Sequence, residues 1–353
     1  MDMVYLYRID EKYKEVITNR FPDRGINDIK QLVGENVSGL EVEGIVLFSS
    51  NCSEFERKNF KKMFPKMKCY IFFVEYAENI IENEEKTQQE LNNLIFDETQ
   101  WIDSLQVPVA KHCNLNCNRC YHFSNLVKYP EYYSIQEYKK DLQSLKALQI
   151  HIGEIRFLGG EPLLNNDLFD YIAYSRELYP YSVFKIITNG LLLKKLTHSQ
   201  CEKINRLNVI VSISLYPPLI PFMRIIEEDL NEFSVKYEVF RTGNHFEKVL
   251  LRRQTENGQE TADRCWKCVI VYSGKIGRCA AGMFIEDFNK YFNMSYPNNN
   301  VQDLDVFVSA AELIAYLDDA VPLCYWCVGD ERVESFPWSK STNITISDYV
   351  IEN

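Results

Sequence analysis

The sequence predicts an α/β protein with a parallel sheet or barrel at its centre. From about residue 104 to 245, short apolar segments of strand type alternate with longer segments of helical periodicity. A chain that alternates strands and helices builds a parallel sheet or barrel, because each helix carries the chain back to the start of the next strand. Active sites of such sheets lie at the carboxyl ends of the strands. The polar motifs of this region all follow a predicted strand.

The elements of this central region follow one another in a regular order. Ser134 and Glu137 form a capping box, which predicts that the first helix begins there. Strands are expected at Leu105–Ala110, Glu154–Leu158, Val183–Thr188, Asn208–Ser214 and Lys236–Phe240. Helices are expected at Ser134–Leu148, Asp167–Leu178, Ser199–Leu207 and Pro221–Phe233.

Residues 1–100 predict a separate small α/β domain. Ile45–Ser49 is an apolar segment of buried-strand type, Glu54–Phe64 has helical periodicity, and Cys69–Val74 is a second strand. This order is that of a βαβ unit, in which a dinucleotide site needs a glycine-rich turn after the first strand. The turn at Ser49–Ser53 contains no glycine. We therefore expect a degenerate Rossmann-like domain with a structural or partner-binding role.

A chain of 353 residues is long for one domain. Glu78–Glu90 is polar and rich in acidic residues, as expected for a linker or an exposed helix, so the first boundary is predicted between this stretch and residue 104. We expect three domains: the small α/β domain at 1–100, the central strand–helix region at 104–245, and a C-terminal region at 246–353.

Composition and charge exclude several classes of protein. The 39 basic and 50 acidic residues give a net charge of −11 without any basic run, so a nucleic-acid partner is not expected. The N-terminus carries no signal-peptide pattern, and no apolar run reaches the roughly 18 residues of a membrane span. Most of the 11 cysteines fall into clusters. Clustered cysteines without an export signal indicate metal binding in a reducing cytoplasm.

Cys113, Cys117 and Cys120 place three thiols within eight residues, directly after the first predicted strand of the central region. Thiolates are the usual ligands of iron–sulfur clusters, and a cubane of four irons needs four ligands. Three protein ligands leave one iron open, and an open coordination position is where a metal centre does its chemistry. Zinc sites normally present Cys-x2-Cys twice, which this spacing does not match. The three thiols therefore predict an iron–sulfur enzyme.

The motif Cys113-x3-Cys117-x2-Cys120 resembles the signature of the radical S-adenosylmethionine (radical SAM) enzymes. Leu158-Gly-Gly-Glu-Pro162 and Ile187-Thr-Asn-Gly190 follow it in the order and at the distances that this family shows. The resemblance covers roughly residues 105–340 and is nearest to a subgroup associated with polysaccharide or sugar biosynthesis. It implies a partial (β/α)6 barrel, preceded by the small N-terminal domain and followed by a cysteine-rich, cluster-binding extension.

The resemblance also implies how the open iron is used. S-adenosylmethionine would bind the open iron of a 4Fe-4S cluster through its amino and carboxylate groups. One electron from the reduced cluster would then cleave it to methionine and a 5′-deoxyadenosyl radical, which removes a hydrogen atom from the substrate. The protein orients the cofactor, excludes water and presents one hydrogen atom. An electron donor such as flavodoxin or ferredoxin is implied as a partner.

Candidate cofactor-binding residues lie at the ends of the predicted strands. By resemblance, the Gly-Gly-Glu-Pro segment binds the amino group of the cofactor. The short polar side chains after the next two strands would hold ribose hydroxyls or the carboxylate, with turn capping as their alternative role. Arg119 stands where the family usually has an aromatic residue that stacks on adenine, and the aromatic residue of this chain closest to that position is Tyr121. The candidates are Gly159, Gly160, Glu161, Pro162, Thr188, Asn189, Ser212, Ser214 and, for adenine, Tyr121.

Five further cysteines form a second set of thiols in the C-terminal region: Cys265, Cys268, Cys279, Cys324 and Cys327. A cubane ligated wholly by protein uses four thiolates, so one of the five is spare, and Cys265 and Cys268 compete for one position. The pattern looks like the twitch or SPASM type of domain that follows radical SAM cores, here with one auxiliary 4Fe-4S cluster. Zinc is the alternative metal, because Cys-x2-Cys pairs are its usual ligands.

Two residues outside these motifs are candidates for the catalytic groups, which are otherwise unknown. Cys201 lies in a predicted helix, where a cysteine is most often a small packed hydrophobic residue; a thiol hydrogen donor, as an epimerase needs, is the alternative. Tyr216 precedes Pro217-Pro218 at a predicted strand end and is a candidate substrate contact.

Together these features predict a cytoplasmic radical SAM enzyme that oxidises or epimerises a sugar, a polyol or a nucleotide-sugar. The alternative enzyme is a SPASM-type maturase of ribosomal peptides. The sequence shows no obvious winged-helix domain for leader binding near the N-terminus, which makes this alternative less favoured. The non-enzymatic alternative is a zinc- or iron-bearing scaffold protein. The substrate, the net reaction and the oligomeric state follow from no motif in the chain.

Overall fold

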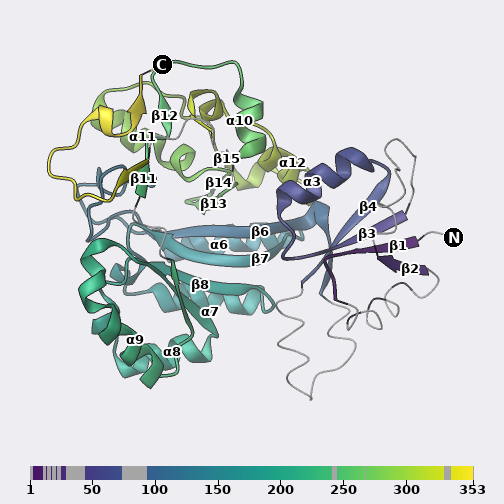
Figure 1. Ribbon diagram of the computed structural model, residues 1–353, viewed down its shortest axis with the longest axis horizontal. Coiled ribbons are helices and arrows are strands. Elements are labelled where there is room, and N and C mark those ends of the chain that lie inside the picture. The colour runs from purple at the N-terminus through teal and green to yellow at the C-terminus, as the bar shows by residue number, and fades with distance from the viewer. Residues whose placement is uncertain are drawn as a thin grey trace. The chain divides into compact units, whose positions relative to one another are not determined.

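The structure, a computed structural model, describes residues 3–10, 13, 17, 21, 25–28, 44–73, 94–240, 245–265, 267–329 and 335–352 of the 353-residue chain (Figure 1). The chain divides into two compact units, Met1–Asp103 and Ser104–Asn353. The stretch Glu78–Glu90, which we predicted as a linker or exposed helix, lies outside the described residues.

The first unit is built on a five-stranded sheet in the order β2-β1-β3-β4-β5. Strands β1 to β4 run parallel, and β5 is antiparallel to β4. The elements are β1 Met3–Tyr7, β2 Gly25–Asp28, β3 Gly44–Ser49, α3 Glu54–Met63, β4 Met67–Phe72, β5 Ile95–Asp97 and the 3-10 helix η2 Glu98–Gln100. The predicted strand–helix–strand order is present as β3, α3 and β4. Strand β4 ends at Phe72, and its predicted end, Val74, lies outside the described residues.

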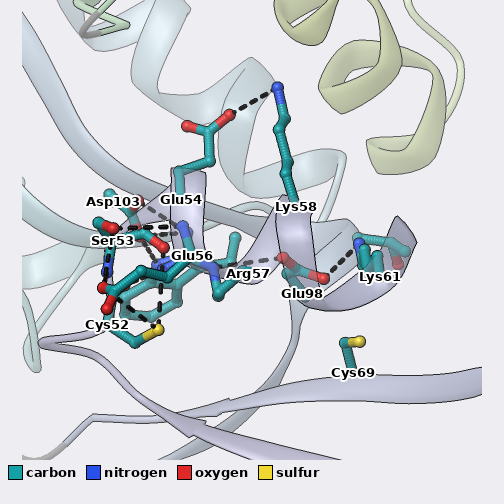
Figure 2. A network of polar contacts seen from close by, with 12 residues as sticks. Cys52, Ser53, Glu54, Glu56, Arg57, Lys58, Lys61, Cys69, Glu98 and Asp103 are labelled. Carbon is teal, nitrogen blue, oxygen red and sulfur yellow. Dashed lines mark hydrogen bonds and ion pairs between the residues drawn. The ribbon is translucent and has the colours of Figure 1, made fainter. Parts of the chain in front are cut away.

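Polar side chains fix the start of α3 in the first unit (Figure 2). The Ser53 hydroxyl accepts from the backbone N–H of Glu56, whose carboxylate accepts from the backbone N–H of Ser53. Arg57 is buried and pairs with Glu98 and Asp103, which compensates its charge. Carboxylates already occupy the first turn of α3, where a helix N-terminus would otherwise attract a phosphate. Whether this domain lacks a dinucleotide site stays a prediction.

The second unit centres on an eight-stranded sheet in the order β10-β9-β8-β7-β6-β13-β14-β15. Strands β7 to β10 pair in parallel. Strand β6 (Trp101–Ala110) begins in the last residues of the first unit and continues into the second. The elements that follow it are α6 Ile135–Ala147, β7 His151–Gly159, η3 Pro162–Leu164, α7 Leu168–Leu178, β8 Val183–Thr188, η4 Leu193–Lys195, α8 His198–Arg206, β9 Val209–Ser214, η5 Pro217–Phe222, α9 Met223–Glu232 and β10 Tyr237–Phe240. Strands and helices alternate as predicted. The α/β class, with a sheet of the partial-barrel type, is confirmed.

Local signals in the sequence explain these elements. Ser134 and Thr197 accept hydrogen bonds from the third residue of α6 and α8, and so define where these helices begin. The central strands are rich in buried Ile, Val and Phe, as expected for a parallel sheet covered on both faces. In the strand register, Ile187 of β8 lies opposite Ser212 of β9. The carboxyl ends of these strands, and the motifs that follow them, therefore lie side by side.

The C-terminal region extends this sheet and adds helices. Strand β13 (Val269–Tyr272) pairs in parallel with β6, and β14 and β15 follow in antiparallel order. The remaining elements are β11 His245–Glu247, β12 Leu250–Leu251, α10 Gly258–Arg264, β14 Lys275–Gly277, α11 Ala280–Phe292, β15 Gln302–Asp303, η6 Leu304–Val306, α12 Ala310–Asp318, η7 Pro322–Trp326, β16 Ser335–Pro337, η9 Ile346–Asp348 and β17 Val350–Ile351. Figure 1 shows these elements in green and yellow beyond β6, on the side away from β8 and α9.

A shared apolar core ties this region to the loop after β6. Phe288 of α11 packs against Phe123 of that loop and against Tyr349 near the end of the chain, with ring centroids 5.1 and 5.4 Å apart. All three side chains are buried. Aromatic contacts of this kind join segments that are far apart in the sequence. Among the helices that the structure describes, each is too short or too polar to cross a lipid bilayer.

Candidate functional site

Cys113, Cys117 and Cys120 lie in the loop that follows β6, and we call residues 112–125 the triad loop. Burial raises the pKa of Cys113 to about 11 and that of Cys117 to about 12, and repulsion from the charge of Cys120 acts in the same direction on both. The three sulfur atoms are therefore close enough to interact electrostatically. Thiols with such pKa values are neutral at pH 7 without a metal, and a metal that binds them displaces their protons.

Gly159 packs against the end of β6, and Gly160 packs against the start of the triad loop. The backbone N–H of Gly160 donates to the carbonyl of Ala110 at 2.6 Å. The backbone N–H of Glu161 donates to the carbonyl of His112 at 3.1 Å. A Cβ on Gly159 would lie 2.1 Å from the Ala110 oxygen, and a Cβ on Gly160 would lie 2.0 Å from the His112 oxygen. Only glycine permits this approach. The two glycines thus hold the end of β6 and the start of the triad loop against the end of β7.

Glu161 is fully buried and ties the end of β7 to the end of β8. Its carboxylate accepts hydrogen bonds from the Thr188 hydroxyl at 2.7 Å, the Asn189 N–H at 2.9 Å and the Leu163 N–H at 3.1 Å. Burial raises the pKa of Glu161 to about 7, although the three donors act to lower it. The observed contacts are those of a positioning residue. Contact between this segment, including the buried Pro162, and the cofactor's amino group stays a prediction.

Asn189 connects the end of β8 with the triad loop. Its side-chain amide donates to Asn114 at 2.7 Å and lies 3.6 Å from the sulfur of Cys113. Its side-chain oxygen accepts from the N–H of Leu191 at 3.0 Å, as in a turn cap. The fold therefore brings the two predicted motifs together, and Asn189 has both a capping contact and a contact with the triad loop.

Ser212 on β9 offers an unused polar group at this edge of the sheet. It is fully buried, and within the described part of the chain its hydroxyl has no hydrogen-bond partner. A buried hydroxyl without a partner is costly unless another polar group fills the site. Contact between Ser212 and the predicted cofactor stays a prediction.

The charges of the triad cysteines also affect the hydroxyl of Tyr216. Burial raises the pKa of its hydroxyl, and the next cause is the charge of Cys117, followed by that of Cys120. The side chain of Ser214 hydrogen-bonds to Tyr216 and acts in the opposite direction. The thiols of the triad thus act electrostatically on Tyr216, and its contact with substrate stays a prediction.

Cys201 is placed differently. It lies on α8 and is buried where that helix packs on the sheet. Burial raises the pKa of its thiol. This is the environment of a small packed hydrophobic residue, and it gives no support to the role of a hydrogen donor to the substrate.

The five C-terminal thiols gather around Cys279. Cys279 caps the N-terminus of α11, and its sulfur accepts from the Gly282 N–H at 3.4 Å. Burial raises the pKa of each of the other four thiols, and the charge of Cys279 acts in the same direction on Cys265, Cys268, Cys324 and Cys327. Cysteines from three separate segments are therefore neighbours in the fold. Which four of them bind a metal stays a prediction.

Arg278 places a buried positive charge beside this set. Its guanidinium donates to the carbonyls of Asp318 at 2.8 Å, Asp319 at 2.9 Å and Ala262 at 2.6 Å, at the C-terminal ends of α12 and α10. Burial raises the pKa of Cys265, Cys268 and Cys324, and the charge of Arg278 opposes this effect only in part. A nearby cation acts in favour of the thiolate form, so Arg278 would help to balance the charge of thiolates at this place.

Tyr121 follows the third triad cysteine but belongs to the C-terminal set. Its hydroxyl lies 2.9 Å from the sulfur of Cys279. Burial raises the pKa of this hydroxyl, and the charge of Cys279 is the next cause. The placement gives no support to the predicted contact with adenine. It shows instead that Cys120, Tyr121 and Cys279 link the two sets of thiols.

No motif marks the residues near the C-terminus that contact the triad loop. The indole N–H of Trp338 donates to the sulfur of Cys117 at 3.1 Å, across 221 positions in the sequence. Arg119 pairs with Asp348 at 3.3 Å and lies over the ring of Phe336, 4.1 Å from its centroid. Arg119, the residue that departs from the family pattern, therefore has partners in this chain. No local spacing could have predicted them, because they meet only in the fold.

In the described ranges, no three His, Cys, Asp or Glu side chains converge on the position of a single metal ion. The ligands of one zinc ion all lie about 2–2.3 Å from it. The thiolates of a cubane each bind a different iron atom and stand farther apart. Iron as the metal of either set of thiols stays a prediction.

Comparison with known proteins concerns mainly the central region. Residues 107–216 match the family model described as the Radical SAM superfamily. GTP 3′,8-cyclase of Paenarthrobacter nicotinovorans is 31% identical over 111 residues, which are 30% of this chain and 30% of that protein. GTP 3′,8-cyclase of Clostridium acetobutylicum is 35% identical over 101 residues, which are 27% of this chain and 30% of that protein. The chain thus spans about 30% of the length of the curated relatives it matches.

Among solved structures, the crystal structure of BtrN in complex with AdoMet and 2-DOIA is similar with a TM-score of 0.43 and 17% sequence identity. The similarity covers 70% of this chain and 98% of that chain. The family match at 107–216 contains the triad, both strand-end motifs and the two serines of β9. It therefore falls on the residues that the fold brings to one edge of the sheet.

Proposed function

We propose that this protein is a radical SAM enzyme, in which Cys113, Cys117 and Cys120 bind a 4Fe-4S cluster whose open iron takes S-adenosylmethionine. The observation that carries this proposal is the coincidence of the Radical SAM match with the edge of the sheet where Asn189, at the end of β8, contacts Cys113 of the triad. When bound, the cluster and cofactor supply a 5′-deoxyadenosyl radical that takes a hydrogen atom from the substrate.

The residues around the triad have distinct roles in this proposal. Glu161 fixes the end of β8 through Thr188 and the Asn189 backbone, so that the loop and the strand end keep one geometry. Ser212 presents its free hydroxyl to a ribose hydroxyl or a carboxylate of the cofactor. Tyr216, next to the triad sulfurs, excludes water and faces the substrate. Rigid surroundings of this kind restrict a radical to one hydrogen atom.

The C-terminal thiols hold an auxiliary 4Fe-4S cluster in this proposal, with four of the five cysteines as ligands. A cluster ligated wholly by protein has no open iron and serves electron transfer. Arg278 balances part of its negative charge, and Tyr121 hydrogen-bonds one of its ligands. Such a cluster can accept the second electron from a substrate radical. This role favours a net oxidation of the substrate.

For the substrate we propose a sugar, polyol or nucleotide-sugar. Support comes from the segments around the triad and β9 that resemble the sugar-associated subgroup. The relatives named as GTP 3′,8-cyclases indicate that a nucleotide also fits a site of this kind. A sugar or nucleotide-sugar substrate should raise deoxyadenosine formation above the level seen without substrate. Stimulation by a peptide alone would instead support a peptide maturase.

Metal analysis separates the enzyme from a scaffold protein. After anaerobic reconstitution, we expect about eight iron atoms per chain, from two cubanes. Replacing the three triad cysteines with alanine should reduce this to about four. Iron near zero together with bound zinc would contradict the proposal and support a zinc scaffold.

A further inference from the structure

We propose that the segment 335–349, which we call the C-terminal strap, positions the triad cluster, and that the indole N–H of Trp338 raises the reduction potential of this cluster through its hydrogen bond to the sulfur of Cys117. The inference rests on the proposed function, since it needs a cluster on the triad. The strap contains no metal-ligating motif and lies outside the residues of the family match.

The backbone of the strap holds the backbone of the triad loop. Cys117 and Lys340 form an antiparallel bridge. On one side of it, the N–H of Asn118 donates to the carbonyl of Ser339 at 2.9 Å. On the other, the N–H of Ser341 donates to the carbonyl of Asn116 at 2.8 Å. The residues on both sides of Cys117 are therefore fixed by a segment more than 200 positions away.

Side chains reinforce this contact at and between two residues with unusual backbone angles. Asn116 and Arg119 have positive φ angles of 56° and 60°, a conformation that non-glycine residues seldom adopt. The Asn116 amide donates to the carbonyl of Ser341 at 3.0 Å. The Asn118 amide donates to Asp348 at 2.9 Å, and Arg119 pairs with the same carboxylate. The strap thus holds the loop in a conformation that its own sequence does not favour.

Trp338 gives the strap an electronic role as well. Its N–H lies 3.1 Å from the sulfur of Cys117, which is itself buried. A reduced cluster carries one more negative charge than an oxidised cluster, and a donor to a ligand sulfur stabilises that charge. The hydrogen bond therefore makes the cluster easier to reduce. Trp338 is a positioning residue, since it acts through Cys117 rather than on the substrate.

Replacing Trp338 with phenylalanine tests the electronic role, because the ring remains and the donor is lost. The reconstituted full-length protein is titrated electrochemically while its EPR signals are recorded, and the triad cluster is identified as the signal that changes when S-adenosylmethionine is added. In Trp338→Phe we expect the ratio of reduced to oxidised triad cluster at a fixed potential to fall about tenfold, a shift of about 59 mV to more negative values.

Trp101→Phe is the matched control. It removes the same kind of donor, which bonds Asp103 at 2.6 Å in the first unit, and it should leave the potential of the triad cluster unchanged. An equal shift in both variants, or no shift in Trp338→Phe, would overturn the inference.

A second measurement needs no variant. Wild-type protein labelled with 15N in its indole rings should show a 15N coupling to the signal that responds to S-adenosylmethionine. Absence of this coupling overturns the inference even if Trp338→Phe fails to assemble a cluster. If the wild type shows no signal that responds to S-adenosylmethionine, the proposed function itself fails, so the two failures are distinguishable.

Discussion

Burial and hydrogen bonding act in opposite directions on Glu161, at the carboxyl edge of the sheet. Burial favours the neutral acid, and the donors from Thr188, Asn189 and Leu163 favour the carboxylate, with a resulting pKa of about 7. Since the folded-state pKa lies above the ordinary value of 4.5, the folded protein binds this proton more tightly than the unfolded chain. A bound cation at this edge would oppose the effect of burial and favour the carboxylate.

The stability of the metal-free protein should therefore depend on pH through Glu161. The contribution of Glu161 to the free energy of unfolding is fully present below about pH 4.5 and is lost as the pH rises through about 7. We expect the free energy of unfolding to fall over this range in the wild type and to fall less in Glu161→Gln, as measured by urea unfolding at a series of pH values. The control is Glu177→Gln, at an exposed position on α7. A pH dependence in Glu161→Gln equal to that of the control would refute this role.

Gly160 should tolerate no side chain. Its Cβ would meet the carbonyl oxygen of His112 at 2.0 Å, so that backbone must move. We expect Gly160→Ala to destabilise the protein by about 3 kcal/mol, the upper range of overpacking, and to lose the triad cluster. Gly274→Ala is the control: φ is +79° and nothing lies within 4 Å, so a cost of about 1–2 kcal/mol with full iron is expected. Urea midpoints and iron per chain distinguish the two, and full iron in Gly160→Ala would count against the proposed packing.

At the scale of elements, Arg278 joins α10 and α12 beside the C-terminal thiols. Its guanidinium reaches three carbonyls at once, which a lysine ammonium cannot do because its donors radiate from one atom. Arg278→Lys should therefore lower the free energy of unfolding by about 2–3 kcal/mol and reduce auxiliary iron. Arg224→Lys on α9, where the side chain is exposed, should change it by less than about 0.5 kcal/mol. Equal effects of the two substitutions in urea unfolding would disprove the linking role.

The sequence predicted the elements that carry their own local signal. The alternation from β6 to β10, the cap at Ser134 and the position of the triad after β6 all follow from periodicity and spacing. The orientation of Tyr121 and the contact from Trp338 do not, because each joins residues at least 158 positions apart. A strand-end rule places motifs on an edge of the sheet, but it does not say which distant side chain turns toward them.

At the scale of the molecule, the two sets of thiols should have separable functions. Cofactor cleavage needs only the triad, whereas a complete reaction that removes two electrons needs an acceptor. We expect the double variant Cys324→Ala, Cys327→Ala to form 5′-deoxyadenosine but no substrate-derived product. The measurement is simultaneous chromatography of deoxyadenosine and product with the substrate that stimulates the wild type. Equal loss of both compounds would argue against a distinct auxiliary role.

The central claim is that the triad supports reductive cleavage of S-adenosylmethionine. Its most direct test is anaerobic reconstitution, addition of a strong reductant and S-adenosylmethionine, and measurement of 5′-deoxyadenosine. We expect deoxyadenosine from the wild type and from Cys69→Ala, which alters a buried thiol of the first unit, and none from Cys117→Ala. Wild-type protein that contains its full iron and still forms no deoxyadenosine would rule out this reaction.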